Sequence, residues 1–211
     1  MIENARLYLV STARLPSGVD LVDLVGELAG AGVGAIQLRE KDMEATDLVR
    51  AGEPIHDACR AAGIPFILND RADIALALGA DGVHVGQNDL SVGLCRRILG
   101  TGAIVGLSTH APHEIDLTLG APDRSDYIAV GPVHATPTKP GRPATGLDLV
   151  RYAAEHVSDL PWFAIGGINS SNVGAAMEAG ARRIVVVRAI TEARDPVAAA
   201  ADLSAELEAG R

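Results

Sequence analysis

Two polar segments that lie far apart in the chain carry side chains able to bind phosphate. Thr136-Pro137-Thr138-Lys139 follows an apolar run and offers two hydroxyl groups and an ammonium in a proline-rich stretch. Gln37-Leu38-Arg39-Glu40-Lys41 follows another apolar run. In it, Arg39 supplies a planar fork for phosphate oxygens, and Lys41 supplies a mobile point charge. Together the two segments indicate a site for phosphorylated ligands.

The basic residues of the upstream segment are expected to share one face. Side chains alternate along an extended chain, so Gln37, Arg39 and Lys41 point one way, and Leu38 and Glu40 point the other. A solvated charge run at a strand edge is the structural alternative. These residues emerge directly from an apolar run, however, where a purely structural sequence more often turns with Gly or Asp. This position favours ligand binding.

Two carboxylates between these segments could hold a metal ion. Asp70 follows Asn69 at the end of one apolar run, and Asp89 follows the next run. Taken singly, an Asp at such a position is more often a helix cap. As a pair near several basic residues, two carboxylates with room for water suit Mg²⁺ bound to a diphosphate. The sequence therefore predicts a magnesium site at Asp70 and Asp89.

A glycine pair near the C-terminal end of the chain favours a second anion site. Gly166-Gly167 follows an apolar run and precedes Asn169, which we expect to begin a helix. Free backbone N–H groups and the helix dipole favour an anion at such a place, although a plain turn would use the same glycines. Val187-Arg188 ends the last apolar run and could add to this site.

The histidines give a weaker signal. His110 follows Ser108-Thr109 at the end of an apolar run, and His134 precedes the Thr136–Lys139 segment. Neither has the spacing of a metal site. His110 could orient a substrate or move a proton, but it is equally consistent with a structural hydrogen bond.

Short apolar runs alternate with longer helical segments throughout the chain. The expected strands are the eight short runs, namely Arg6–Val10, Ala35–Leu38, Pro65–Leu68, Gly82–Val85, Ile104–Leu107, Tyr127–Val130, Trp162–Ile165 and Ile184–Val187. The expected helices follow them one by one, namely Leu21–Ala29, Ala45–Ala62, Ala72–Leu78, Ser91–Leu99, Pro112–Leu119, Leu147–His156, Asn169–Ala179 and Pro196–Leu207. Ser91 and Asn169 look like N-caps, and glycines stand where five of the helices should end.

This alternation predicts an α/β fold with a parallel sheet. Eight strand–helix units favour a closed (β/α)8 TIM barrel, and we see no linker, so residues 1–211 are expected to form one domain. A doubly wound open sheet is the alternative, but no Gly-x-Gly-x-x-Gly follows the first strand. In a barrel the polar residues named above would converge, because the active site lies where the carboxyl ends of the strands meet.

Composition limits the class of protein. The chain has 211 residues and a net charge of −9 with no basic run, which argues against nucleic-acid binding. Aromatic residues are 3% of the chain, so we expect a core of Ala, Val, Leu and Ile. We find neither a signal peptide nor an apolar run of the ~18 residues that a membrane span needs. With Cys59 and Cys95 as isolated, buried thiols, we expect a cytoplasmic protein.

The ordered set of motifs resembles the thiamine-phosphate synthase family, whose members are also called thiamine-phosphate pyrophosphorylases. The resemblance runs from about Arg6 to Ile190. It rests on the following segments, in order: Gln37–Lys41, Asn69-Asp70, Gly86-Gln87-Asn88-Asp89-Leu90, Gly131-Pro132-Val133 with Thr136–Lys139, and Ala164-Ile165-Gly166-Gly167-Ile168. Each motif alone is moderately specific for the family, and the ordered set is a strong indication of it.

The resemblance implies a (β/α)8 transferase that joins hydroxymethylpyrimidine diphosphate to hydroxyethylthiazole phosphate, or to its carboxylated form, and releases pyrophosphate. It assigns the pyrimidine diphosphate to Gln37, Leu38, Arg39, Glu40, Lys41, Asn69, Ser108 and Lys139. It assigns the thiazole phosphate to Thr136, Pro137, Thr138, Gly167, Val187 and Arg188. Arg39, Lys41, Lys139 and Ser108 would be catalytic, with Mg²⁺ on Asp70 and Asp89. The implied mechanism is dissociative and needs no protein nucleophile.

One departure from the family and three other functions stay open. Many relatives have Ser where this chain has Arg188, so a role for the Val187-Arg188 backbone is safer than one for the Arg188 side chain. The nearest alternative is a thiazole tautomerase of the same fold, with His110 as the acid or base. A non-catalytic thiamine-phosphate-binding protein and a sugar-phosphate epimerase are the others. The sequence leaves the oligomeric state open.

Overall fold

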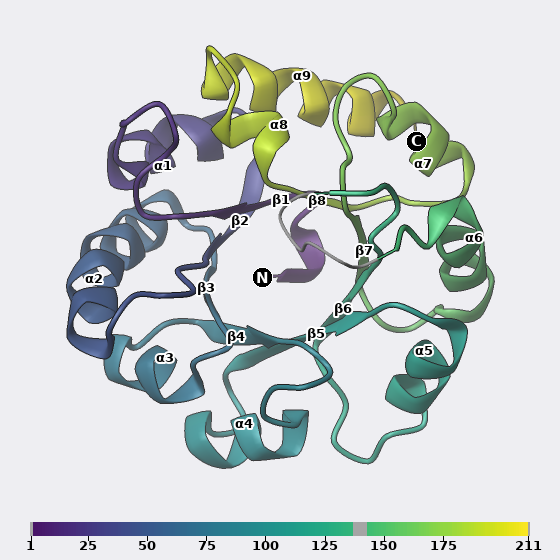
Figure 1. The fold of residues 1–211 in the computed structure, drawn as a ribbon, viewed down its shortest axis with the longest axis horizontal. Coiled ribbons are helices and arrows are strands. Elements are labelled where there is room, and N and C mark those ends of the chain that lie inside the picture. Colours follow the sequence, from purple (N-terminus) through teal and green to yellow (C-terminus); the bar gives the residue numbers. More distant parts are fainter. Residues whose placement is uncertain (1, 137–142, 211) are drawn as a thin grey trace.

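The computed structural model describes residues 2–136 and 143–210, so the predicted site residues Pro137, Thr138 and Lys139 lie outside the described residues. In the described chain the strands form a closed parallel barrel in sequence order, in which β1 pairs with both β2 and β8. Helices surround this ring (Figure 1). The strands are β1 (Leu7–Ser11), β2 (Val33–Leu38), β3 (Phe66–Asn69), β4 (Gly82–Val85), β5 (Ile104–Thr109), β6 (Tyr127–Val130), β7 (Trp162–Ile165) and β8 (Ile184–Val186). The predicted (β/α)8 barrel is confirmed.

The helices lie outside the ring, apart from one short N-terminal turn. They are η1 (Ile2–Asn4), α1 (Leu21–Gly30), α2 (Ala45–Ala62), α3 (Ala72–Leu78), α4 (Val92–Leu99), α5 (Pro112–Leu119), α6 (Gly146–His156), α7 (Val173–Glu178), α8 (Arg188–Thr191) and α9 (Pro196–Ala209). The 3-10 turn η1 lies within the ring of strands in Figure 1. Within the described residues no helix is long and apolar enough to cross a membrane.

Most of the predicted elements are confirmed within two residues. Ser91 is an N-cap, as predicted, because its side chain accepts a hydrogen bond from the Leu94 N–H at 3.3 Å. The predicted start of α7 at Asn169 is wrong. The helix begins at Val173, because the Asn169 side chain accepts from the Ser171 N–H and its own N–H donates to Asn172. These local bonds form a turn that competes with the helix.

The end of the last strand also differs from the prediction. Val187 was expected to close the strand, but β8 ends at Val186, and Val187 caps the short helix α8. A helix of four residues is too short to show an apolar period, so sequence patterning could not reveal it. This helix carries Arg188 on its first turn.

Two apolar layers hold the barrel together. One lies between the strands and the surrounding helices. The other, the barrel-interior cluster, comprises Ile2, Ala5, Tyr8, Val10, Ala35, Ile67, Tyr127, Phe163 and Val185. The rings of Tyr8, Tyr127 and Phe163 meet edge to face at 5.5–5.8 Å between centroids. The core is built mostly of Ala, Val, Leu and Ile, as expected, and the scarce aromatic residues gather in the barrel interior.

Gly106 provides a test of how tightly the interior is packed. A Cβ built at this position would overlap the ring of Tyr127 and lie 2.5 Å from Nδ1 of His84. We expect Gly106→Ala to lower the free energy of unfolding by about 1–3 kcal/mol or more, because a packed interior has no room for an added methyl group. Thermal and denaturant unfolding would measure the change.

Gly26 is the matched control for this substitution. It lies in α1, where an added Cβ meets no atom within 4 Å. Gly26→Ala should leave stability unchanged or raise it by about 0.5–1 kcal/mol, because Ala is the better helix former. Equal stability of the two variants would contradict the tight packing at Gly106.

Candidate functional site

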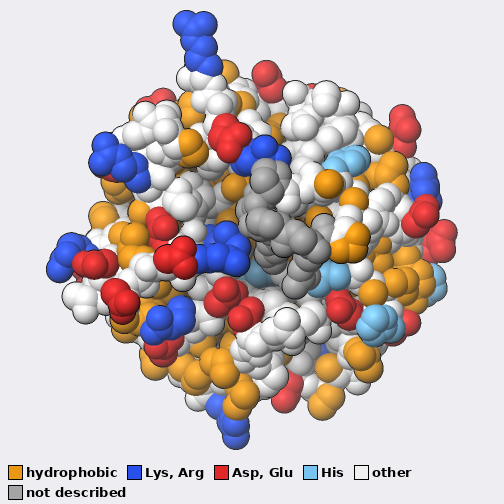
Figure 2. All heavy atoms as spheres, viewed as in Figure 1, with side chains coloured by type: hydrophobic (Ala, Val, Ile, Leu, Met, Phe, Trp, Pro, Cys, Tyr) orange, Lys and Arg blue, Asp and Glu red, His pale blue; other side chains and the backbone are white. Residues whose placement is uncertain are grey.

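The carboxyl ends of the strands open on one face of the barrel, where charged side chains gather. Figure 2 shows basic and acidic side chains together near the centre of this face, on the side of β2, β3 and β4. Two cavities lie at this face. The first is lined by residues that follow β5, β6, β7 and β8, and the second by the segment that follows β2.

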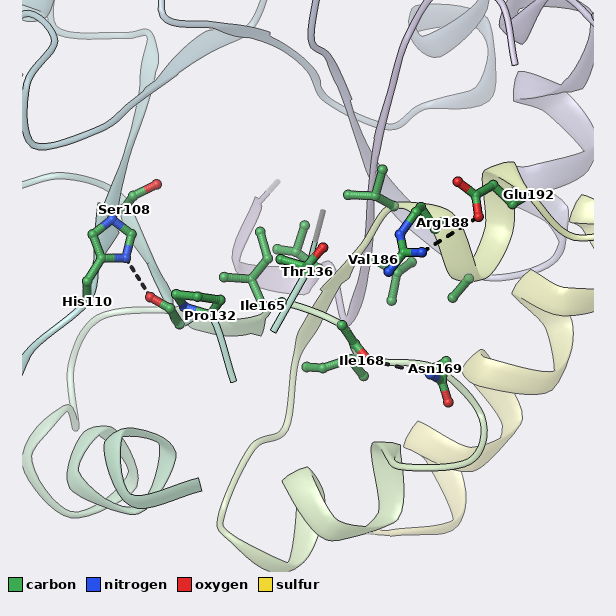
Figure 3. A pocket seen from close by; sticks show the side chains of 16 residues that line it. Ser108, His110, Pro132, Thr136, Ile165, Ile168, Asn169, Val186, Arg188 and Glu192 are labelled. Atoms are coloured by element: carbon green, nitrogen blue, oxygen red, sulfur yellow. Dashed lines mark hydrogen bonds and ion pairs between the residues drawn. The ribbon is translucent and has the colours of Figure 1, made fainter. Parts of the chain in front are cut away.

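The first cavity has a volume of about 280 Å³ and brings several predicted residues together. Ser108, Thr136, Gly167, Val187 and Arg188 all line it. Four of these were assigned to the thiazole phosphate and one to the pyrimidine diphosphate. The cavity wall is otherwise formed largely by backbone and apolar side chains, among them those of Pro132, Ile165 and Ile168 (Figure 3).

Backbone hydrogen bonds fix the wall that β6 and β7 share. The N–H of Val133 donates to the Ile165 carbonyl at 2.8 Å, and the N–H of His134 donates to the Gly166 carbonyl at 2.9 Å. On the far side of the loop, Thr145 donates to the Pro132 carbonyl from its N–H at 2.7 Å and from its hydroxyl at 3.0 Å. These bonds hold both ends of the loop that carries Thr136.

Close backbone approach explains the glycine pair at the end of β7. Gly167 has a φ of 66°, and a Cβ there would lie 2.8 Å from the Cβ of His134. Gly166 has a φ of 107°, and its Cβ would lie 2.5 Å from Pro132. Only glycine fits both the space and the conformation. The pair therefore allows the β6 loop to pack directly on the end of β7.

Arg188 and Glu192 stand together at the edge of the first cavity. Nη1 of Arg188 lies 3.9 Å from Oε2 of Glu192, and each side chain is less than half exposed, with values of 42% and 49% (Figure 3). Both residues line the cavity. The Arg188 side chain thus contacts a carboxylate of its own helical turn, and its backbone begins α8 behind Val187.

The second cavity lies beside the basic segment that follows β2 and has a volume of about 410 Å³. Arg39, Glu40 and Lys41 line it together with Thr12, Asp42 and Met43. Glu40 has a structural contact as well, because its Oε1 accepts a hydrogen bond from the N–H of Ala13 at 2.7 Å. The Leu38 side chain is fully buried between sheet and helices, so only its backbone could reach a ligand.

Arg39 is the basic residue held most firmly at this cavity. Its N–H donates to the Ser11 carbonyl at 2.8 Å. Burial lowers the pKa of the guanidinium, and the charge of Asp70 opposes that shift. Within the described residues, its buried Nη2 has no hydrogen-bond partner. A buried guanidinium nitrogen without an acceptor is suited to an anionic ligand.

Asp70 adopts a backbone conformation that side chains rarely occupy. Its φ is 60°, and among the described residues it is the one residue other than glycine with a positive φ. The N–H of Asp70 donates to the His84 carbonyl at 2.9 Å, directly after Asn69, which pairs with His84 at the end of β3. Backbone conformations of this kind cluster at active sites and ligand-binding segments.

Asp89 shapes the turn that follows β4. Its Oδ2 accepts a hydrogen bond from the N–H of Gly86 at 2.8 Å, and this leaves Oδ1 for another partner. The described residues contain no cluster of three His, Cys, Asp or Glu side chains that could hold a metal. Mg²⁺ is usually held by one or two carboxylates, with waters and substrate phosphates completing its ligands, so the magnesium site at Asp70 and Asp89 stays a prediction.

A buried chain of hydrogen bonds lies beneath the mouth. Gln37 Nε2 donates to the Tyr8 hydroxyl at 2.8 Å, and the hydroxyls of Tyr8 and Tyr127 are 2.9 Å apart. The His84 ring joins Tyr127 to Ser108, with both distances at 2.9 Å. Sequence analysis missed Tyr8, His84 and Tyr127. Their signal was a polar group at an inward-facing strand position, which for His84 is the alternate position to Gly82.

His110 has a structural contact at the edge of the first cavity. Its Nδ1 is hydrogen-bonded to the Gly131 carbonyl, as Figure 3 shows. Its N–H also donates to Glu114 at 2.6 Å. The ring therefore joins the end of β5 to the end of β6, and this contact agrees with the structural interpretation of His110.

The fold is a (β/α)8 barrel with two cavities at the carboxyl ends of its strands. A family model described as thiamine monophosphate synthase matches residues 7–190. A thiamine-phosphate synthase of Acidothermus cellulolyticus is 50% identical over 208 residues, which are 99% of this chain and 97% of the relative. One of Thermus thermophilus is 50% identical over 203 residues, which are 96% and 97% of the two chains.

A solved structure agrees with these relatives. The thiamine phosphate pyrophosphorylase of Pyrococcus furiosus matches with a TM-score of 0.87 at 29% identity, over 100% of this chain and 99% of that one. The chain belongs to the thiamine monophosphate synthase family. It is a transferase of thiamine biosynthesis.

The strain at Asp70 can be measured by comparing two small replacements. We expect Asp70→Gly to be more stable than Asp70→Ala by about 1–2 kcal/mol, because Ala resists a positive φ and Gly does not. Chemical denaturation of both variants would measure the difference in the free energy of unfolding.

Glu27 serves as the control position for the same pair of replacements. It is exposed in the middle of α1, where the backbone is helical. There the order should reverse, with Glu27→Ala more stable than Glu27→Gly by about 1 kcal/mol. The same order at both positions would show that the Asp70 backbone is not strained.

Proposed function

We propose that this protein is a thiamine-phosphate synthase that transfers the hydroxymethylpyrimidine group from its diphosphate to hydroxyethylthiazole phosphate, or to the carboxylated thiazole phosphate. The products are thiamine monophosphate and pyrophosphate. The observation that carries the proposal is the pair of cavities at one mouth. Residues assigned to the diphosphate line one cavity, and most of those assigned to the thiazole phosphate line the other.

The pyrimidine diphosphate would lie over β2, β3 and β5. Arg39 and Lys41 would bind the phosphate oxygens, and the buried Nη2 of Arg39 supports this role because it needs an acceptor. Lys139 is assigned to the same leaving group by the resemblance. Gln37, Asn69 and Ser108 would contact the uncharged part of the substrate, since all three are neutral hydrogen-bonding groups.

The thiazole phosphate would occupy the first cavity. Thr136 and the backbone of Gly167, Val187 and Arg188 line it, and backbone N–H groups are suitable partners for a phosphate. Pro137 and Thr138 belong to the same predicted set. The apolar side chains of Ile165 and Ile168 would cover the ring. Ser108 lines this cavity too, so the two substrates would meet near it.

Asp70 and Asp89 would hold Mg²⁺, which supplies charge neutralisation for the diphosphate when it is bound. The left-handed backbone of Asp70 at the end of β3 supports this assignment, since such conformations cluster at ligand-binding and active sites. Asp70 also lies close enough to Arg39 for its charge to affect the pKa of the guanidinium. Both charges would therefore act at the same leaving group.

The chemistry would be a displacement at the exocyclic methylene of the pyrimidine. The bond between this carbon and the diphosphate oxygen breaks first, and its electron pair leaves with the diphosphate. The electron-rich aminopyrimidine stabilises the methylene cation, and the lone pair of the thiazole nitrogen then forms the new bond. The protein positions both substrates and stabilises charge on the departing oxygen through Arg39, Lys41 and Lys139.

The proposal is tested by an endpoint assay with the two thiamine precursors. We expect pyrophosphate release that requires both the thiazole phosphate and Mg²⁺. The double variant Asp70→Asn with Asp89→Asn should lose activity together with its response to Mg²⁺, because it removes both charged oxygen ligands. Release that needs no thiazole phosphate would reject the function, and an active, Mg²⁺-responsive double variant would reject the metal site.

Arg39 and Lys139 test how the leaving group is stabilised. Arg39→Ala and Lys139→Ala should each lower turnover by roughly 10²-fold or more, because removing one group that stabilises transition-state charge costs ~3 kcal/mol. Steady-state kinetics would measure the change. Arg50→Ala is the control, since Arg50 is exposed on α2 and pairs with Asp47. Wild-type kinetics in both site variants would exclude this assignment.

A further inference from the structure

Side chains from five different strands form one hydrogen-bonded chain through the barrel interior. In order they are Gln37 of β2, Tyr8 of β1, Tyr127 of β6, His84 of β4 and Ser108 of β5. All are at most 7% exposed. Both ends of this chain, Gln37 and Ser108, are residues assigned to the pyrimidine substrate. The three residues between them have no assigned role.

The number of protons fixes the direction of this chain. Gln37 Nε2 donates to the Tyr8 hydroxyl, so the Tyr8 proton is left for Tyr127, and the Tyr127 proton is left for Nδ1 of His84. Three links thus use three protons. If Nδ1 of His84 also carried a proton, four protons would compete for the three links. One buried tyrosine hydroxyl would then have no acceptor within this chain of hydrogen bonds, which is unfavourable. From this count we infer that His84 is neutral, with its proton on Nε2.

The direction decides what the far end of the chain offers. His84 Nε2 and Ser108 Oγ are 2.9 Å apart, and with the inferred tautomer the Nε2–H of His84 donates to this oxygen. Because Oγ accepts this bond, the Ser108 proton points elsewhere, and Ser108 lines the first cavity. At the other end, the Gln37 amide uses its nitrogen on Tyr8, which turns its oxygen away from Tyr8.

The surroundings keep both phenols in the form that this arrangement needs. Burial raises the pKa of the Tyr8 hydroxyl and that of the Tyr127 hydroxyl, so both keep their protons at neutral pH. The His84 ring stacks on Tyr127 with centroids 5.4 Å apart, and Gly106 leaves room for both rings. Phe163 packs against both tyrosines and has no polar atom on its side chain.

We propose that Tyr8, Tyr127 and His84 are positioning residues that set the hydrogen-bond polarity of the pyrimidine site. They make Gln37 present an acceptor oxygen and Ser108 present a donor hydroxyl. An aminopyrimidine edge offers the complement, since its amino group donates and its ring nitrogen accepts. In a pyrimidinone the amino group is replaced by a carbonyl oxygen, which accepts, and the ring nitrogen carries a hydrogen, which donates. Its edge therefore offers the reverse pattern of donor and acceptor. The inference rests on the proposed function, because it assumes that the pyrimidine binds here.

The first experiment compares two pyrimidine alcohols that carry no diphosphate and cannot react. One is hydroxymethylpyrimidine, which carries the amino group, and the other is its analogue with an oxo group in place of the amino group. The inhibition constant of each compound is measured. The wild-type protein should prefer the amino compound. In Tyr127→Phe, His84 loses its fixed tautomer and Ser108 can turn, so this preference should fall by roughly tenfold or more. An unchanged preference in a folded Tyr127→Phe protein overturns the proposal.

Phe163→Leu is the matched control for this variant. It loosens the same barrel-interior cluster without removing a hydrogen bond. Its stability should fall while the preference for the amino compound stays at the wild-type value. If Phe163→Leu loses the preference to the same extent, packing rather than hydrogen-bond direction is responsible, and the proposal is wrong.

The second experiment reads the His84 tautomer without any substrate. ¹⁵N NMR of histidine-labelled protein, with the signal assigned by its loss in His84→Gln, should show a neutral ring protonated on Nε2 at pH 7. In Tyr127→Phe the shifts should move toward a mixture of tautomers. A proton on Nδ1 in the wild type overturns the proposal. This readout is independent of turnover, so a missing pyrophosphate release would reject the proposed function and not the hydrogen-bond chain.

Discussion

Closure of the strand ring is the constraint on which the site depends. Because β1 pairs in parallel with both β2 and β8, every strand has its carboxyl end on the same face. Gln37, Ser108 and Gly167 are far apart in the chain, yet each ends up at this one mouth. An open sheet would spread the same strand ends along an edge. In this protein, therefore, the barrel itself brings together residues that no single loop could provide.

The alternation of side chains along each strand then divides the interior from the outer layer. On β1, Leu7 and Leu9 pack under the helices, whereas Tyr8 and Val10 point into the barrel. The inward-facing Gln37 lies beside Val10 and Ile67 of the neighbouring strands, which belong to the barrel-interior cluster. The aromatic rings of this cluster fill the interior and have few rotatable bonds. This packing gives the polar groups above it a rigid support.

The sequence predicted the barrel because each strand is a short apolar run and each helix has recognisable ends. It also predicted several of the residues that line the two cavities, since position after a strand decides this, whereas the predicted site residues Gln37, Asn69, Asp70 and Asp89 line neither of them. It failed where the cause is not periodic. Local side-chain bonds of Asn169 delay α7, and α8 is too short for a pattern. The link from His84 to Tyr127 joins β4 to β6, which lie on either side of β5, so no nearby residue in the sequence could indicate it.

Burial separates the two kinds of polar group in the site. Charged groups at the mouth keep access to water or to each other, as Arg39 does beside Asp70, because an isolated buried charge is very costly. The buried polar groups Tyr8, Tyr127 and His84 are hydrogen-bonded to one another, which makes their burial tolerable. Under the proposed function this separation matches the substrate. The neutral pyrimidine ring would face the buried chain, and the charged diphosphate would face the open cavity, from which it can leave into water.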